Sequence, residues 1–271
     1  MPLVAVALGC VRCTVCSVSL CGHAVTVVEG GTVSTLHDRL RANLGRVRDR
    51  IASACAAAGR SPESVRLVAV TKYAQWSWVE ELIGLGVTDL GESRPQQLER
   101  RAPLSAGRVT WHLIGHLQRN KVRKVLPLAR WIHSVDSARL LDRIELIAAE
   151  LQVRPRVLLE VNVSGEASKD GLSPSELLEN ADRWRAVRHA DLCGLMTMAP
   201  LVARSSEARP YFDRLVQLRD RLREMWDDPA ALPELSMGMS NDFDAAIAAG
   251  ATCVRIGRAL FEGLEEVDGG T

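Results

Sequence analysis

Residues 234–261 read ELSMGMSNDFDAAIAAGATCVRIGRALF, and this stretch decides the fold class. It contains two short apolar strand candidates, 234–238 and 253–257, which are separated by the helical pattern FDAAIAAG. A strand, a helix and a second strand in close succession are typical of a parallel β-α-β unit. The second strand candidate ends at Gly257, where the chain turns again into RALFEG.

Strand and helix patterns alternate in the same way through the earlier part of the chain. The six further strand candidates are VRLVAVT (65–71), VTDLGE (87–92), VTWHLIG (109–115), WIHSVD (131–136), RVLLEVNV (156–163) and ADLCGLMTM (190–198). Continuous apolar runs such as LVAV and VLLEV suit strands that are covered on both faces. Eight strands with helices between them predict an α/β protein, a single (β/α)8 TIM-like barrel rather than an open sheet.

The N-terminal part of the chain differs from the barrel. Residues 34–58 place leucine, valine and isoleucine at three- and four-residue steps, which predicts an extra N-terminal helix ending at Gly59. In the atypical segment 1–33, Arg12 and several polar residues interrupt any signal-peptide or membrane-spanning pattern. The expected organisation is a poorly ordered Cys-rich extension (1–33), a barrel domain (34–265) and a C-terminal tail (266–271).

The cysteines fall into two groups. Four of the seven lie in the extension, at Cys10, Cys13, Cys16 and Cys21, with spacings that superficially resemble a metal or iron–sulfur site. We expect no metal there, nor at the HLIGH pair His112 and His116, which lacks an intervening glutamate. The remaining three have apolar neighbours, which predicts buried free thiols in a reducing cytoplasm: Cys55, Cys193 and Cys253.

The composition excludes several classes of protein and partner. Apolar residues make up 47% of the 271 residues and charged residues 25%, values that exclude disorder, collagen and coiled coil. A net charge of +1 creates no overall field that would attract nucleic acid or an anionic membrane, so we expect neither partner. The basic run QRNKVRK (118–124) is expected to form the solvated face of a helix.

Candidate chemistry lies where the barrel strands end, because active sites of such barrels form at the carboxyl ends of the strands. Lys72 follows the first strand directly and is one of only four lysines among 34 cationic residues. It is either a lysine that extends to the solvated rim or a nucleophilic amine. Tyr73 should face the opposite way if strand alternation continues.

The loops after the last two strands are the second candidate feature. Ser240 or Asn241 reads as a helix N-cap, and free amides at helix starts after strands seven and eight commonly bind phosphate. Ordinary capping and turn formation is the competing interpretation. Arg255, inside the last strand, needs a partner at the barrel mouth. An amine, a phosphate cradle and an arginine together suggest pyridoxal phosphate, although a phosphosugar aldolase would also use the first two.

Six ordered motifs resemble one known family. They are LVAVTK (67–72), WHLIGHLQRNK (111–121), NVSGEASKDG (162–171), GLMTMAP (194–200), SMGMSNDFDAAIAAG (236–250) and VRIGRALF (254–261). Together they resemble the pyridoxal phosphate homeostasis proteins, the YggS/PROSC-like family. The resemblance implies a fold-type III barrel like the alanine racemase N-terminal domain, which holds pyridoxal 5′-phosphate as an internal aldimine on Lys72.

The resemblance also implies roles for further residues. It places Arg255 against the pyridine nitrogen, assigns the phosphate to Ser240 with the amides near Met239, Gly257 and Arg258, and lines the pocket with Asn162 and Met196. Arg258 stands where the family frequently has threonine. No residue is assigned a catalytic role.

The function implied is a monomeric, non-catalytic carrier in pyridoxal phosphate homeostasis, with pyridoxal phosphate-dependent apo-enzymes as recipients. An arginine cannot accept a proton, so Arg255 would leave the ring nitrogen unprotonated and the ring a weak electron sink. Few residues follow the last strand to build the second domain of a racemase. The alternatives are a low-activity racemase-like pyridoxal phosphate enzyme and a cofactor-free Schiff-base aldolase.

Overall fold

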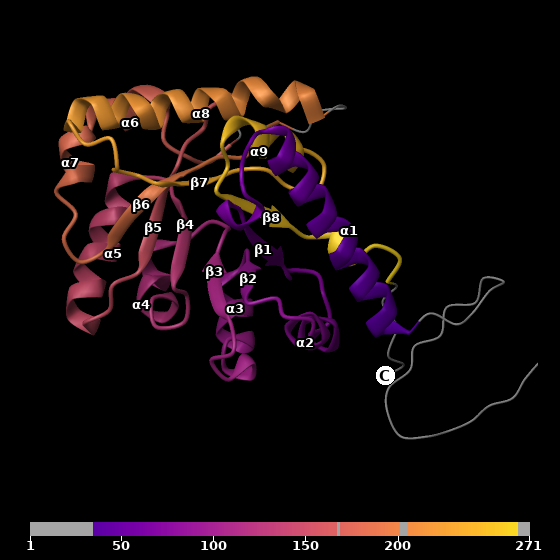
Figure 1. Ribbon diagram of the computed structural model, residues 1–271. Coiled ribbons are helices and arrows are strands. Elements are labelled where there is room, and N and C mark those ends of the chain that lie inside the picture. The colour runs from indigo at the N-terminus through magenta and orange to yellow at the C-terminus, as the bar shows by residue number, and fades with distance from the viewer. Residues whose placement is uncertain (1–34, 167–168, 201–204, 265–271) are drawn as a thin grey trace, which may run out of the picture.

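The computed structural model describes residues 35–166, 169–200 and 205–264, and it contains a closed parallel barrel (Figure 1). Eight strands are hydrogen-bonded in chain order, and the last pairs with the first. They are β1 (Arg66–Val70), β2 (Asp89–Glu92), β3 (Thr110–Leu113), β4 (Trp131–Val135), β5 (Arg156–Glu160), β6 (Asp191–Met196), β7 (Glu234–Ser236) and β8 (Cys253–Ile256). The predicted (β/α)8 barrel is confirmed, with each strand slightly shorter than its apolar run.

Helices cover the outside of this barrel (Figure 1). The α-helices are α1 (Leu36–Ala57), α2 (Trp76–Gly84), α3 (Pro95–Arg101), α4 (Val122–Val125), α5 (Ala138–Leu151), α6 (Pro174–Glu179), α7 (Ala181–Arg185), α8 (Ser205–Trp226) and α9 (Phe243–Ala249). The 3-10 turns are η1 (Pro62–Ser64), η2 (Pro103–Ser105), η3 (Arg119–Lys121) and η4 (Arg258–Leu260). Among the described residues, no helix has both the length and the apolar character to cross a membrane.

The extra N-terminal helix is present as α1. Its N-cap Thr35 accepts a hydrogen bond from the Asp38 amide, and the Asp38 carboxylate accepts from the Thr35 amide, so the first turn is capped reciprocally. Its apolar stripe is buried, and α1 lies beside α9 (Figure 1). Gly59, at φ +66°, follows the C-cap, as expected for a glycine that ends a helix.

The barrel interior contains polar as well as apolar side chains. Most apolar side chains form one large core cluster, while a smaller cluster contains Trp131, Leu158, Cys193 and Met196. The buried polar side chains include His112, His133, Ser236 and Arg255, which come from four different strands. Buried polar groups are stable only when hydrogen-bonded, so their partners have to come from across the barrel.

Two local predictions are corrected. The helix after β7 begins at Phe243 with Asp242 as N-cap, not at Ser240 or Asn241, because the Asp242 carboxylate accepts from the Met239 amide and closes the preceding turn. The basic run 118–124 does not form one long helix face but the short elements η3 and α4. Val122 is buried there, while Arg119 is exposed.

The cysteines are placed only in part. Cys55, Cys193 and Cys253 are buried and free, as predicted. The four cysteines of the extension lie outside the described residues.

Candidate functional site

A cavity of about 800 Å3 opens at the carboxyl ends of β1 and β8. Its walls include Lys72 from the loop after β1, Ser240 from the loop after β7, and Gly257 with Arg258 after β8. The barrel therefore brings together four of the residues assigned to the site from sequence. Val70, Trp78 and Phe261 supply apolar surface to the same cavity.

Lys72 reaches the cavity because of where β1 ends. Val68 on β1 pairs in register with Arg255 on β8, and Val70, two residues further along, lines the cavity. Lys72 is exposed, and its ammonium lies 4.9 Å from the centre of the Tyr73 ring. Strand alternation predicted that the two side chains point apart, and this prediction is wrong. The reason is that β1 ends at Val70, so both residues belong to the following turn.

The loop that carries Lys72 is held in place by a buried ion pair between Arg101 and Glu92. Arg101 Nη1 lies 2.6 Å from the Glu92 carboxylate and donates to the Thr71 carbonyl at the same distance, while its Nη2 donates to the Ala74 carbonyl at 2.5 Å. The Thr71 hydroxyl also donates to Glu92, at 2.6 Å. Burial raises the pKa of the Glu92 carboxyl despite these donors. One guanidinium thus holds the backbone on both sides of Lys72.

The opposite wall is formed by the turns after β7 and β8. The Ser240 hydroxyl accepts a hydrogen bond from the Ala259 amide at 3.4 Å, which connects the two turns. Gly257 precedes η4, and a side chain there would project against Val70 at 3.4 Å. The Met239 amide is engaged by Asp242, and Met239 does not line the cavity.

Arg255 is buried inside the barrel and is not among the residues that line this cavity. Only 4% of its surface is exposed. Its Nη1 donates to Ser236 Oγ at 2.6 Å and its Nη2 to the Thr197 carbonyl at 3.0 Å. Burial lowers the pKa of Arg255, and the nearby Glu160 and Asp242 carboxylates oppose that effect. A guanidinium nevertheless stays protonated at neutral pH, so Arg255 is a fixed, oriented donor.

Asn162 and Met196 lie away from the cavity walls. Asn162 organises its own loop, because its amide donates to the Glu166 and Lys169 carbonyls and its oxygen accepts from the Gly165 amide. Met196 is fully buried in the small interior cluster. Neither side chain is among those that line the cavity with Lys72.

The two histidines of HLIGH have separate environments. His112 is buried and bonded to Asp89 and His133, as expected of a structural histidine. His116 is half exposed at the rim, with Nδ1 3.1 Å from an Asp136 carboxylate oxygen. Within the described ranges no group of three or more His, Cys, Asp or Glu side chains is arranged to hold a metal.

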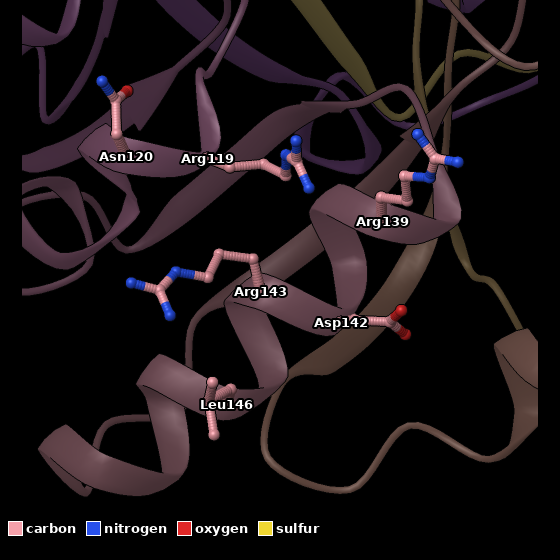
Figure 2. A pocket seen from close by; sticks show the side chains of 6 residues that line it. All are labelled: Arg119, Asn120, Arg139, Asp142, Arg143 and Leu146. Carbon is pink, nitrogen blue, oxygen red and sulfur yellow. The ribbon is translucent and has the colours of Figure 1, made fainter.

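A second hollow lies on the outer surface, between η3 and α5 (Figure 2). It measures about 480 Å3 and is lined by Arg119, Asn120, Arg139, Asp142, Arg143 and Leu146. Figure 2 shows the three guanidiniums pointing in different directions rather than at one centre. Arginine has no nucleophilic amine, so this surface offers charge but none of the chemistry that Lys72 provides.

Sequence reasoning missed Glu92, Arg101, His133 and Ser236. Glu92 ends the second apolar strand, and a charged residue at the carboxyl end of a barrel strand was a signal that could have identified it. His133 and Ser236 gave no comparable signal, because they meet from strands 103 residues apart.

Comparisons with known proteins agree with this geometry. The family described as "Alanine racemase, N-terminal domain" matches residues 37–265. A pyridoxal phosphate homeostasis protein of Aquifex aeolicus is 39% identical over 219 residues, which is 80% of this chain and 95% of the relative.

Two solved structures share the fold. PipY of Synechococcus elongatus, solved with PLP bound, superposes with a TM-score of 0.72 at 32% identity, over 82% of this chain and 99% of PipY. An alanine racemase of Clostridium difficile shares the fold at 17% identity, with a TM-score of 0.63 over 83% of this chain and 56% of the racemase. The chain belongs to the alanine racemase N-terminal domain family and, within it, to the pyridoxal phosphate homeostasis proteins.

Proposed function

We propose that this protein binds pyridoxal 5′-phosphate at the barrel mouth and acts in its homeostasis as a carrier rather than as a catalyst. The observation that carries the proposal is the single cavity shared by Lys72, Ser240, Gly257 and Arg258. Lys72 on one wall and the turns of Ser240, Gly257 and Arg258 on the other support an amine that faces a phosphate cradle. Relatives named as homeostasis proteins, and PipY with PLP bound, support the assignment.

The residues present fit this cofactor. The cavity volume lies within the range of about 300–1,000 Å3 typical of small-molecule sites. Gly257 leaves the cradle open on the β8 side, and the exposed Arg258 guanidinium lines the same cavity, where an anion can reach it. When bound, pyridoxal phosphate supplies an aldehyde and an electron-accepting ring.

Each residue has a distinct role in the proposal. Lys72 would supply the amine that attaches the cofactor covalently through its aldehyde. Ser240 and the backbone at Gly257 and Arg258 would hold the phosphate. Arg255 would donate to the ring nitrogen and keep it unprotonated, because arginine does not give up its proton at neutral pH. Such a site retains the cofactor but weakens the ring as an electron sink, which suits a carrier.

The experiment is reduction of the protein–cofactor complex. The purified chain is mixed with pyridoxal phosphate, treated with borohydride and digested, and the modified peptide is identified by mass spectrometry. We expect attachment at Lys72, loss of attachment in Lys72→Arg, and attachment at Lys72 unchanged in Lys124→Arg, whose lysine is exposed on α4. Covalent attachment that persists in Lys72→Arg would refute the site.

A racemase-like activity is the second candidate, because the fold is shared with an alanine racemase. That racemase is longer than the region matched here, since the alignment covers 56% of it. Incubation with a panel of amino acids in deuterium oxide, followed by chirality and α-carbon exchange, separates the two. The carrier proposal predicts negligible turnover of amino acids. It also predicts that the protein is a cytoplasmic monomer and releases the cofactor to a pyridoxal phosphate-dependent apo-enzyme.

A further inference from the structure

Five polar side chains form one hydrogen-bonded line through the barrel interior, which we call the interior array. They are Asp89, His112, His133, Ser236 and Arg255. The successive distances are 3.0 Å from Asp89 Oδ1 to His112 Nε2, 2.9 Å from His112 Nδ1 to His133 Nε2, 2.8 Å from His133 Nδ1 to Ser236 Oγ, and 2.6 Å from Ser236 Oγ to Arg255 Nη1.

The donor direction along the array follows from its two ends. Arg255 can only donate, so Ser236 Oγ accepts from it and its own hydroxyl proton is free for His133 Nδ1. His133 then carries its proton on Nε2 and donates to His112 Nδ1. His112 in turn carries its proton on Nε2 and donates to the Asp89 carboxylate. Every bond is satisfied with both imidazoles neutral.

The reverse direction requires an additional buried charge. His112 would have to donate from both ring nitrogens, which makes it an imidazolium inside the barrel. Burial lowers the pKa of His112, although the Asp89 carboxylate opposes this shift. Burial, together with the nearby His112 and Arg255, lowers the pKa of His133 well below its usual value. The neutral arrangement is therefore the one the site favours.

The array also explains how a buried cation is tolerated. Arg255 is almost fully buried, and among the described residues its guanidinium is hydrogen-bonded to neutral groups rather than ion-paired. The Ser236 oxygen and the Thr197 carbonyl solvate it, and the oriented imidazoles continue to the Asp89 carboxylate. Asp89 begins β2, and its Oδ1 lies 3.6 Å from Nε of Arg66. The Arg66 guanidinium also forms an ion pair with Glu234. The far end of the array is thus fixed by ion pairs at the amino-terminal side of the barrel.

Two of the five N–H donors of Arg255 are used by Ser236 and Thr197, so donors remain for a ligand at the mouth. We propose that Ser236, His133 and His112, with Asp89 as the anionic end, are positioning residues that orient Arg255 toward the ring nitrogen of the bound cofactor. This inference rests on the proposed function. It predicts that Arg255 depends for its orientation on residues that do not touch the cofactor.

The first test uses the full chain without cofactor. Nitrogen-15 NMR of the imidazole side chains reports which ring nitrogen carries the proton. We expect both His112 and His133 to be neutral, with the proton on Nε2, at pH 7. A proton on Nδ1 of either ring, or a doubly protonated ring, would overturn the array whether or not the protein binds pyridoxal phosphate.

The second test breaks the link to Arg255 with small substitutions. Ser236→Ala should weaken pyridoxal phosphate binding about tenfold, as expected for a hydrogen bond to a charged group, and shift the visible band of the complex. Ser236→Thr keeps a hydroxyl and should restore both values. Ser134→Ala is the matched control, because Ser134 is a buried barrel serine that donates instead to the Gly115 carbonyl.

The outcomes separate the two proposals. If the unsubstituted chain binds pyridoxal phosphate and Ser236→Ala matches Ser134→Ala in affinity and spectrum, the positioning role is wrong while the proposed function stands. If the unsubstituted chain fails to bind pyridoxal phosphate, both are wrong, even where NMR finds the expected protonation of His112 and His133.

Discussion

Arg101 joins the buried Glu92 carboxylate to the backbone that presents Lys72, with 2.6 Å from its Nη1 to both Glu92 Oε1 and the Thr71 carbonyl. The contact crosses from α3 to the ends of β1 and β2. Gln97, also on α3, donates to the Lys72 carbonyl at 3.1 Å. The position of the amine is therefore set by a neighbouring β-α unit and not by β1 alone.

Arg101→Met tests this anchoring. The substitution leaves Glu92 buried without its cation, which costs about 3 kcal/mol by comparison with other broken buried ion pairs. Urea unfolding should detect the loss, and pyridoxal phosphate attachment at Lys72 should slow. Arg100→Met, on the exposed face of the same helix, is the control and should change the free energy of unfolding by less than about 0.5 kcal/mol.

Arg258→Ala tests the phosphate cradle. Arg258 lines the cavity but is exposed, so solvent and salt screen its charge. We expect pyridoxal phosphate affinity to fall by about threefold to tenfold, roughly 1 kcal/mol, with a smaller loss at high salt. Arg185→Ala makes the same change in net charge on the exposed end of α7 and should leave affinity unchanged. Equal affinities in titrations of the two variants would remove Arg258 from the cradle.

Much of the fold could be predicted because its signal is local. Each barrel strand is a short apolar run, and closure into eight parallel strands follows from their number and their alternation with helices. Lys72 and Gly257 could be placed at the mouth because Lys72 lies two residues after the end of β1 and Gly257 directly follows β8. The N-cap of α9 could not be decided, since Ser240, Asn241 and Asp242 are all good caps and a hydrogen bond to Met239 selects the last.

The interior array could not be predicted for a different reason. His133 and Ser236 belong to β4 and β7, and nothing in either strand's sequence specifies the other. Their contact depends on the register of every strand between them around the barrel. The irregular register between β4 and β5 and between β5 and β6 shifts that alignment further.

Gly238→Ala tests whether backbone shape supports the cradle. Gly238 has φ +94°, and a Cβ there would lie 2.6 Å from the Ala246 Cβ and 2.9 Å from the Phe243 Cα. We expect a loss of about 2 kcal/mol or more, because both the conformation and the space exclude a side chain. Gly45→Ala is the opposite case: it lies in α1 with nothing within 4 Å, and should raise stability by up to about 1 kcal/mol. Urea midpoints that move the same way in both variants would contradict the argument.

The buried thiols should resist alkylation in the folded protein. Burial raises the pKa of Cys193 to about 12 and that of Cys253 to about 11, so neither forms the reactive thiolate at pH 8. Iodoacetamide labelling followed by peptide mass spectrometry should find both unmodified in the native protein and modified after denaturation. Rapid native labelling of Cys253 would mean that the barrel opens far more often than its packing implies.

Glu160→Gln should reveal a pH dependence of stability that originates inside the barrel. Burial raises the pKa of Glu160 from 4.5 to about 7, with Asp136 and Asp170 adding to the shift and Arg255 opposing it. The folded state therefore holds this proton more tightly than the unfolded state. The resulting stabilisation is complete below pH 4.5 and is lost as pH rises to about 7.

Urea unfolding of both proteins between pH 4.5 and 8.5 measures this loss. At roughly 1.4 kcal/mol per pKa unit, the unsubstituted chain should lose about 3 kcal/mol relative to Glu160→Gln across the window. Glu179→Gln, at the exposed end of α6, controls for the amide itself and should show no such trend. A difference between wild type and Glu160→Gln that stays constant with pH would mean that Arg255 keeps Glu160 ionised, and the two would then form a buried ion pair inside the barrel.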